Sequence, residues 1–303
     1  SPGSIVISAI EHPAIREQAE MMKNCGWKVY GVQPNQEGII TPEAVIEKLD
    51  EDTALVCVMA VNNETGAIQP IYEIADALIQ YAGNKRKPKF HVDAVQALGK
   101  VPLQLSYKGI DSASMSGHKI RGPRGIGLLY MAQRQEPFLR GGGQESGIRS
   151  GTENLFGILA LTECLERYGK ETTVVAENTK QNKQVECFIQ SIESLQIKGK
   201  PLATLIPLSR KEKPEQYSPW VLQVSFKNIP GEVLVRGLSD KGFYISTGSA
   251  CSSRKMSRPV LEAMKVSKEN ATNAVRFSFG PTTTEEDMNS LFESLKSIVL
   301  LFN

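Results

Sequence analysis

The N-terminal part of the chain alternates short apolar runs with segments whose apolar residues recur at helical spacing. IVISAI (5–10) precedes a helical pattern from Pro13 to Cys25, and ALVCVMAV (54–61) is a continuous apolar run, typical of a strand covered on both faces. Further strands are expected in KVYGV (28–32), KFHVDAV (89–95), DSASMS (111–116) and GIGLLYM (125–131), and further helices in TPEAVIEKL (41–49) and IYEIADALIQYA (71–82). This β-α-β-α order predicts an α/β fold with a mostly parallel sheet flanked by helices.

The pattern changes near Tyr168. Residues 168–195 predict one long helix with a polar face. After it come two separated strands, WVLQVSF (220–226) and AVRFSFG (274–280), and two helical segments at 231–242 and 284–302. We therefore expect a large domain at 1–169 and a smaller α+β domain at 170–303, with the long helix as their connection.

Composition narrows the class of protein. The 303 residues are 41% hydrophobic and 22% charged, with a formal net charge of +2, as expected for a soluble globular protein. No cluster of Lys and Arg is interleaved with aromatic residues, which argues against direct nucleic-acid binding. No apolar run approaches membrane-spanning length and the opening residues lack signal-peptide features, so we expect no membrane association and a cytoplasmic location, with an organellar matrix also open.

The five cysteines argue against a disulfide framework. Their odd number, wide spacing and lack of a C-x-x-C pair also argue against a metal site, and none is expected. Cys25, Cys57, Cys164 and Cys187 lie in apolar or helical patterns and are expected to be buried or half-buried. Cys251 instead lies among small polar residues in FYISTGSACSSRK (243–255), which predicts a solvent-exposed thiol in a loop.

Polar side chains follow three of the expected strands. Asn62, Asn63 and Glu64 follow the apolar strand; Asp93 and Gln96 follow the next; His118 and Lys119 follow the third. Turn chemistry, a helix cap and a surface lysine are the ordinary explanations for each group taken singly. Because ligands of open α/β sheets collect at the carboxyl ends of strands, the groups together indicate a converging site.

Several segments resemble the cysteine desulfurases, which are pyridoxal phosphate (PLP) enzymes of the class V aminotransferase superfamily. EHPAI, VNNETGAIQPI, HVDAVQALGKVPL, SGHKIRGPRGIG, GGGQESGIRSGTEN, GSACSS and RFSFGPTTTEED occur in the order found in that family, from near residue 5 to the C-terminus. GSACSS with its long loop resembles the iron–sulfur-cluster branch. The resemblance implies PLP fold type I and a homodimer.

The resemblance also implies roles for the reacting groups. Lys119 matches the lysine that forms a Schiff base with PLP, where partial burial beside a cationic neighbour lowers a lysine pKa. Asp93 matches the carboxylate that pairs with the pyridine nitrogen, and His12 matches the imidazole that stacks on the ring and moves protons. Cys251 matches the nucleophile that takes sulfur from L-cysteine as a persulfide, releasing L-alanine.

Other residues match binding positions of the family. Gln96 and Asn63 match residues that hydrogen-bond the ring hydroxyl region and the substrate, and Arg276 matches the arginine that takes the substrate α-carboxylate. Ser116 and His118 match phosphate ligands. Thr152 matches a residue that reaches the phosphate in the other subunit.

Two departures from the family pattern leave alternatives open. The family ordinarily has several dozen further upstream residues, including a phosphate-binding G-A-T-E-type segment, and Pro281 stands where an arginine is usual. We expect weak PLP binding without that segment. A selenocysteine lyase, an aminotransferase and a non-catalytic dimerising fragment are the alternatives to a desulfurase. The expected partners are L-cysteine, a second subunit, and a sulfur-acceptor or scaffold protein for iron–sulfur cluster assembly or tRNA thiolation.

Overall fold

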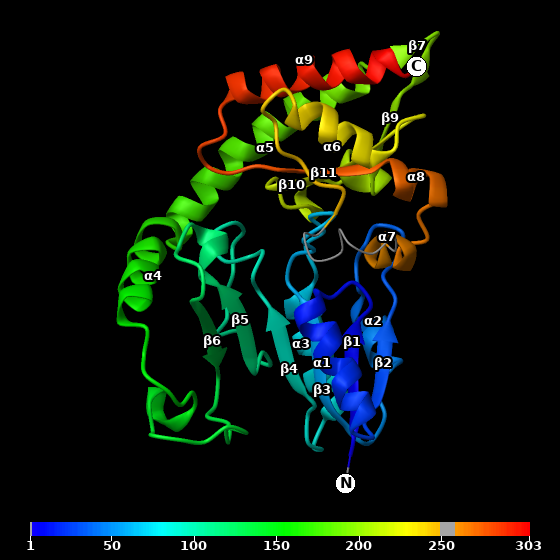
Figure 1. Cartoon of the computed structure of the whole chain (residues 1–303). Helices are drawn as coiled ribbons and strands as arrows, with labels where there is room; N and C mark the ends of the chain where they lie inside the picture. The colour runs from blue at the N-terminus through cyan, green and yellow to red at the C-terminus, as the bar shows by residue number, and fades with distance from the viewer. Residues whose placement is uncertain (1, 249–257) are drawn as a thin grey trace.

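The computed structural model describes residues 2–248 and 258–303 (Figure 1). Within this part of the chain, a six-stranded sheet has the order β2-β1-β3-β4-β5-β6. Its strands are β1 (Ser4–Ser8), β2 (Lys28–Val32), β3 (Thr53–Met59), β4 (Lys89–Asp93), β5 (Ser112–Ser116) and β6 (Gly127–Met131). Neighbouring strands run parallel except β6, which is antiparallel to β5. The predicted α/β fold with a mostly parallel sheet is confirmed.

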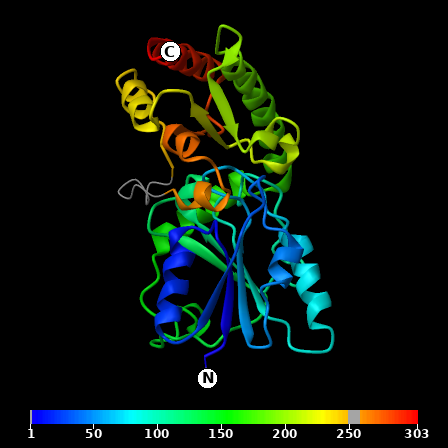
Figure 2. The same cartoon turned by 90° about the vertical axis from the view of Figure 1, so that its right-hand side faces the viewer.

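Helices cover both faces of this sheet (Figure 2). α1 (Pro13–Asn24) lies on one face, where Ala19 packs with Ile5, Ile7 and Cys57. α3 (Ile71–Ala82) lies on the other, and its apolar face joins a core made by the alternate residues of β1, β3 and β4. Alternate side chains of these strands therefore enter two different cores, which explains why every residue of β1 and the last four residues of β3 are buried.

Local sequence explains the positions of the remaining elements of the N-terminal part. α2 (Pro42–Ile46) begins as predicted, since the Thr41 hydroxyl accepts a hydrogen bond from Ala44 N at 3.3 Å and Pro42 occupies the first turn. A 3₁₀ turn, η1 (Gly117–Ile120), follows β5, and another, η2 (Glu145–Gly147), precedes α4 (Leu155–Tyr168). Gly117 is required in η1 because a Cβ there would lie 2.9 Å from Ile126 Cγ2.

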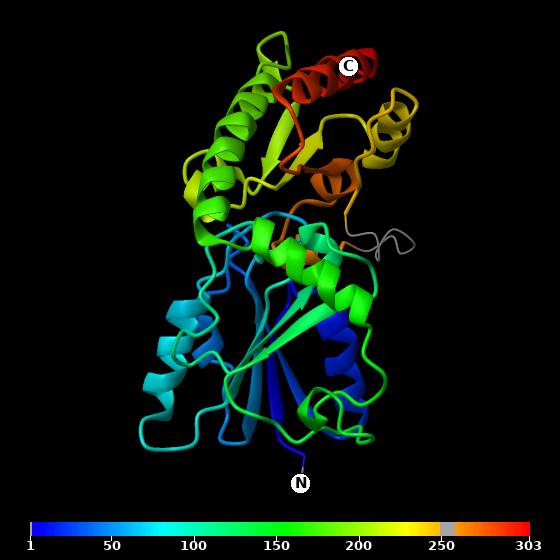
Figure 3. The same ribbon diagram turned by 90° about the vertical axis from the view of Figure 1, so that its left-hand side faces the viewer.

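The C-terminal part builds a second, smaller layer above the carboxyl ends of the large sheet (Figures 1 and 3). The expected long helix is α5 (Glu171–Glu193), and it packs with α6 (Gly231–Ser239) and α9 (Glu285–Leu301) on an antiparallel sheet. That sheet has the order β11-β10-β9, with β9 (Ala203–Ile206), β10 (Val221–Phe226) and β11 (Ala274–Ser278). Smaller elements are β7 (Gln196–Ile197), β8 (Lys200–Pro201), η3 (Leu208–Arg210), η4 (Pro214–Gln216), α7 (Pro259–Ala263) and α8 (Lys268–Asn273).

The division at residue 169 stays a prediction. α5 begins at Glu171, close to the expected boundary. Val260, Leu261 and Met264, however, pack into the core of the large sheet. The segment around α7 therefore ties the C-terminal part to the N-terminal part through apolar contacts.

The expectation of buried or half-buried cysteines is wrong for two of them. Cys57 is buried and Cys164 is half-buried, but Cys25 and Cys187 are exposed. Cys25 caps the solvent-facing end of α1, and Cys187 lies on the outer face of α5. Helical spacing predicts a helix but does not by itself say which face a single cysteine takes. Cys251 lies outside the described residues.

No helix of the described residues combines the length and apolarity that crossing a membrane requires.

Candidate active site

The turn after β3 is fixed by Asn62. Its side-chain oxygen accepts from the backbone N–H groups of Glu64 and Thr65, both at 2.9 Å, and its Nδ2 donates to Ile10 O at 3.1 Å. Turn chemistry is thus the right interpretation for Asn62. The turn places Asn63 and Glu64, both buried, at the carboxyl edge of the sheet.

Asp93 ends β4 and is buried, with 6% of its surface exposed. Its Oδ1 accepts from Val95 N at 3.0 Å, which is the one hydrogen bond of the carboxylate within the described residues. Burial raises the pKa of the carboxyl group, while the Val95 amide and His12 oppose that rise. A carboxylate in this position gains most from a cationic partner.

His12 precedes α1 and faces the same edge. Its Nδ1 accepts from Ala14 N at 3.1 Å, so Nδ1 acts as the acceptor and the proton of the neutral ring belongs on Nε2. Burial lowers the pKa of His12; Asp93 opposes this, and the charge of Lys119 adds to it. Three predicted site residues from three segments are therefore within electrostatic reach of one another.

Lys119 lies on η1 directly after β5, the neighbour of β4. Its side chain is exposed in this structure, so the burial expected for it is not found, although a cationic neighbour is present in Lys100. Ser116 and His118 flank the same turn, and Ser116 Oγ lies 2.7 Å from His118 Nδ1. Burial and the positive charges of Lys119, Arg124 and Lys100 lower the pKa of His118.

Arg276 enters the site from β11 in the C-terminal part of the chain. Its Nη1 donates to Asn63 O at 2.9 Å, which ties β11 to the turn after β3. Burial lowers the pKa of Arg276, whereas the nearby Glu64 raises it. Arg276 Nε is buried and has no hydrogen-bond partner among the described residues, so part of this guanidinium is unsatisfied.

Two further predicted residues have different surroundings. Gln96 is half-buried near Asp93, and its Oε1 accepts from Lys100 Nζ at 2.6 Å. Thr152 is exposed on the segment before α4, and its carbonyl oxygen accepts from Arg149 at 3.3 Å. The structure does not bring Thr152 into contact with the other predicted site residues that it describes.

Sequence reasoning missed two charged residues at this edge. Glu11 is buried, and its Oε1 accepts from Ser8 Oγ and Met59 N, both at 2.6 Å. Burial, with a smaller contribution from Asp93, raises the pKa of Glu11 to about 8. The sequence feature that could have identified Glu11 is its position in EHPAI, directly after an apolar run and before His12.

The second missed residue is Lys100. Burial and the charges of Lys119 and Arg276 lower the pKa of Lys100 to about 8.

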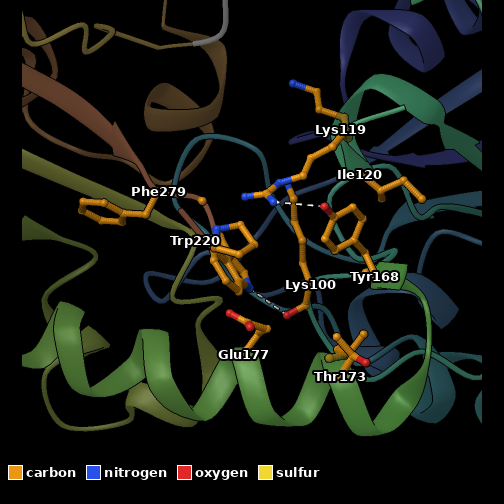
Figure 4. Close-up of a pocket in the computed structure, with 13 residues that line it drawn as sticks. Lys100, Lys119, Ile120, Tyr168, Thr173, Glu177, Trp220 and Phe279 are labelled. Atoms are coloured by element: carbon orange, nitrogen blue, oxygen red, sulfur yellow. Dashed lines mark hydrogen bonds between the residues drawn. The ribbon is translucent and has the colours of Figure 1, made fainter. Parts of the chain in front are cut away.

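A cavity of about 160 Å³ lies between η1, the first turns of α5 and the segment after β11 (Figure 4). Lys100, Lys119 and Arg121 line it together with Tyr168 and Trp220. Arg121 donates to the Tyr168 hydroxyl at 3.3 Å and lies over its ring. Gly280 and Pro281 close the small-domain side, so the proline that departs from the family pattern belongs to this cavity wall.

The donor set fits PLP. A buried carboxylate of raised pKa suits a protonated ring nitrogen, a neutral imidazole lies within its electrostatic reach, and a lysine follows on the adjacent strand. A metal site has no comparable support: no group of three or more His, Cys, Asp or Glu side chains in the described ranges is arranged to hold a metal ion.

Comparison with known proteins identifies the family to which the chain is related. The family model described as "Aminotransferase class-V" matches residues 2–291. The chain belongs to this family. It is 38% identical to the "NifS/IcsS protein homolog" of Lactobacillus delbrueckii subsp. bulgaricus over 99% of the chain and 75% of that protein. It is 36% identical to "Cysteine desulfurase IscS" of Acinetobacter baumannii over 97% of the chain and 70% of that protein.

Solved structures agree with the sequence comparison. A structure titled "NIFS-LIKE PROTEIN" superposes with a TM-score of 0.83 at 33% identity and covers 99% of this chain and 76% of that one. The chain is thus a homologue of the cysteine desulfurases, and the resemblance inferred from the sequence motifs is confirmed. The family implies a PLP-dependent enzyme.

Proposed function

We propose that the protein is a cysteine desulfurase that uses PLP to move sulfur from L-cysteine onto Cys251. The arrangement that carries the proposal is the meeting of Asp93, His12 and Lys119 at one edge of the sheet, with Arg276 reaching in from the other domain. A scaffold without catalysis gains nothing from this set, because burying Asp93 and Arg276 costs free energy.

The chain's own residues divide the work. Asp93 would pair with the ring nitrogen, Lys119 would hold the cofactor covalently, and Ser116 with His118 would bind the phosphate. When bound, PLP supplies an electron sink for negative charge on the substrate carbon. His12, with its proton on Nε2, can give and take protons there.

Arg276 would bind the substrate and Cys251 would react with it. The unsatisfied side of the Arg276 guanidinium offers donors for the α-carboxylate, with Asn63 beside it. The thiolate of Cys251 attacks the substrate sulfur: an S–S bond forms, the C–S bond breaks, and its electron pair stays on the substrate carbon. That carbon takes up one proton, which yields the methyl group of alanine and leaves a persulfide on Cys251.

A homodimer is part of the proposal. Large apolar side chains are exposed on β6, on the segment after it and on α4: Leu128, Leu129, Phe138, Leu139, Leu155, Phe156, Ile158 and Leu159. Large exposed apolar side chains on an edge strand and on the two elements that follow it favour a protein partner. A second copy is the expected occupant, since Thr152 lies on the same segment. Delivery to a sulfur-acceptor or scaffold protein and a cytoplasmic location stay predictions.

Lys119→Ala tests the proposal directly. The variant should lose the visible absorbance of covalently held PLP and all release of alanine and sulfide, with an unchanged circular-dichroism spectrum. Lys108→Ala, at an exposed lysine of the same domain, is the matched control. Borohydride reduction followed by peptide mapping locates the modified lysine. A PLP adduct on another residue of the active protein would contradict the assignment.

A further inference from the structure

Lys100 is a half-buried cation that the proposed chemistry does not use. Its carbonyl oxygen accepts from Trp220 Nε1 at 2.8 Å and from Asn178 Nδ2 at 2.5 Å (Figure 4 shows the Trp220 bond). The backbone of Lys100 is therefore fixed by the small domain and by α5 at the same time. The start of the Lys100 side chain is therefore held in one place relative to both Gln96 and α5.

The side chain of Lys100 contacts Gln96. Lys100 Nζ donates to Gln96 Oε1 at 2.6 Å. An ammonium group has three donors and no acceptor, so the amide must present its oxygen to Lys100. The contact thus selects one of the two orientations of the Gln96 amide and leaves both Nε2 donors for another acceptor.

The surroundings of the Lys100 ammonium group disfavour its positive charge. Among the described residues no carboxylate lies within ion-pair distance of Nζ, and its cationic neighbours are Lys119 and Arg276. Glu177 also lines the cavity without pairing with it. Partial removal of a charge from water with one neutral hydrogen-bond partner is costly, and such charges are more common at functional sites than in structural cores.

We propose that Lys100 is a positioning residue: its ammonium fixes the Gln96 amide so that Nε2 faces the ring hydroxyl of the bound cofactor. This inference rests on the proposed function, because it assigns Gln96 a contact with PLP. It adds a residue that touches neither cofactor nor substrate and acts through its neighbour.

A double-mutant cycle on PLP binding tests the inference. The dissociation constant of PLP is measured by absorbance titration for the wild type, Lys100→Met, Gln96→Leu and the double variant. Lys100→Met keeps the aliphatic stem but removes the donor, and it should weaken PLP binding about tenfold, the size expected for one lost hydrogen bond. The double variant should bind PLP no more weakly than Gln96→Leu alone, because Lys100 acts only through Gln96.

Controls separate positioning from folding. Lys100→Arg keeps a donor and should restore most of the affinity, Lys108→Met should match the wild type, and thermal unfolding reports on the fold. Independent, additive effects of the two substitutions on PLP binding, or an unchanged PLP affinity in Lys100→Met, overturn the inference alone. Absence of any PLP binding by the wild type overturns the proposed function and this inference together.

Discussion

Arg276 on β11 and Asn63 after β3 are joined by a hydrogen bond of 2.9 Å, although 213 positions separate them in the chain. The contact couples the small domain to the carboxyl edge of the large sheet. It also orients the guanidinium while leaving its Nε without a partner among the described residues. If Arg276 binds the substrate as proposed, the same side chain serves substrate recognition and the contact between β11 and the turn after β3.

Arg276→Lys should raise the KM for L-cysteine by about 10- to 100-fold, with a smaller change in kcat. A lysine keeps the charge but cannot form a bidentate pair with a carboxylate, and a hydrogen bond to a charged group contributes about 1.5–3 kcal/mol. Steady-state kinetics measure the effect. Arg236→Lys, on the exposed face of α6, is the control and should behave as the wild type. Equal KM values for both variants would remove Arg276 from substrate binding.

Cys251→Ser should separate cofactor binding from sulfur transfer. The variant should keep the visible absorbance of bound PLP and its response to L-cysteine, but form no persulfide, because a serine hydroxyl is a poor nucleophile toward sulfur. Mass spectrometry of the protein after one turnover detects the added sulfur. Cys187→Ser, at an exposed cysteine of α5, is the matched control. Normal sulfide release by Cys251→Ser would show that another group does the chemistry.

The sequence predicted the positions of those site residues that lie at the ends of strands. Asp93 ends one strand and Lys119 follows the next, and these strands are parallel and adjacent in the sheet, so their carboxyl ends lie at the same edge. The cap at Thr41 was predictable for a different reason, since it depends only on neighbouring residues. Both are cases in which local pattern and topology determine the outcome.

Long-range packing was not predictable in this way. Lys100 is fixed by Trp220, 120 positions away, and by Asn178, 78 positions away. The burial of Glu11 depends on Met59, 48 positions away. Neither partnership leaves a periodic signal, because it arises only when separate elements meet. The exposure of Cys187 was missed for a related reason: helical spacing predicts a helix but does not say how that helix is rotated relative to the core.

The apolar surface of α4 and β6 predicts self-association. Sedimentation velocity should show the wild type as a dimer, and Phe156→Glu should shift it to monomer by weakening association at least about tenfold. Phe156 is 86% exposed, and placing a charge in a desolvated contact costs free energy. Leu208→Glu, at a leucine that is 72% exposed outside this surface, is the control and should leave the dimer intact. A monomeric wild type would contradict the proposal.

Glu11→Gln should make the free energy of unfolding less dependent on pH. The pKa of Glu11 is about 8 in the folded protein against a model-peptide value of 4.5, so the native state binds the proton more tightly than the unfolded state. The stability contributed by protonated Glu11 is fully present below pH 4.5 and is lost as pH rises toward and past 8. Each unit of pKa difference corresponds to about 1.4 kcal/mol, so the total is on the order of several kcal/mol.

Glutamine preserves the carbonyl oxygen that accepts from Ser8 and Met59, and it cannot ionise. Urea unfolding at pH 5 and pH 9, without added PLP, should therefore show Glu11→Gln gaining stability relative to the wild type as pH rises. Glu17→Gln, at an exposed position of α1, should show no such gain. If the stability difference between Glu11→Gln and the wild type is the same at both pH values, Glu11 does not bind its proton more tightly in the folded state. The buried carboxyl would then be ionised at neutral pH, and the Asp93 edge of the site would carry two negative charges rather than one.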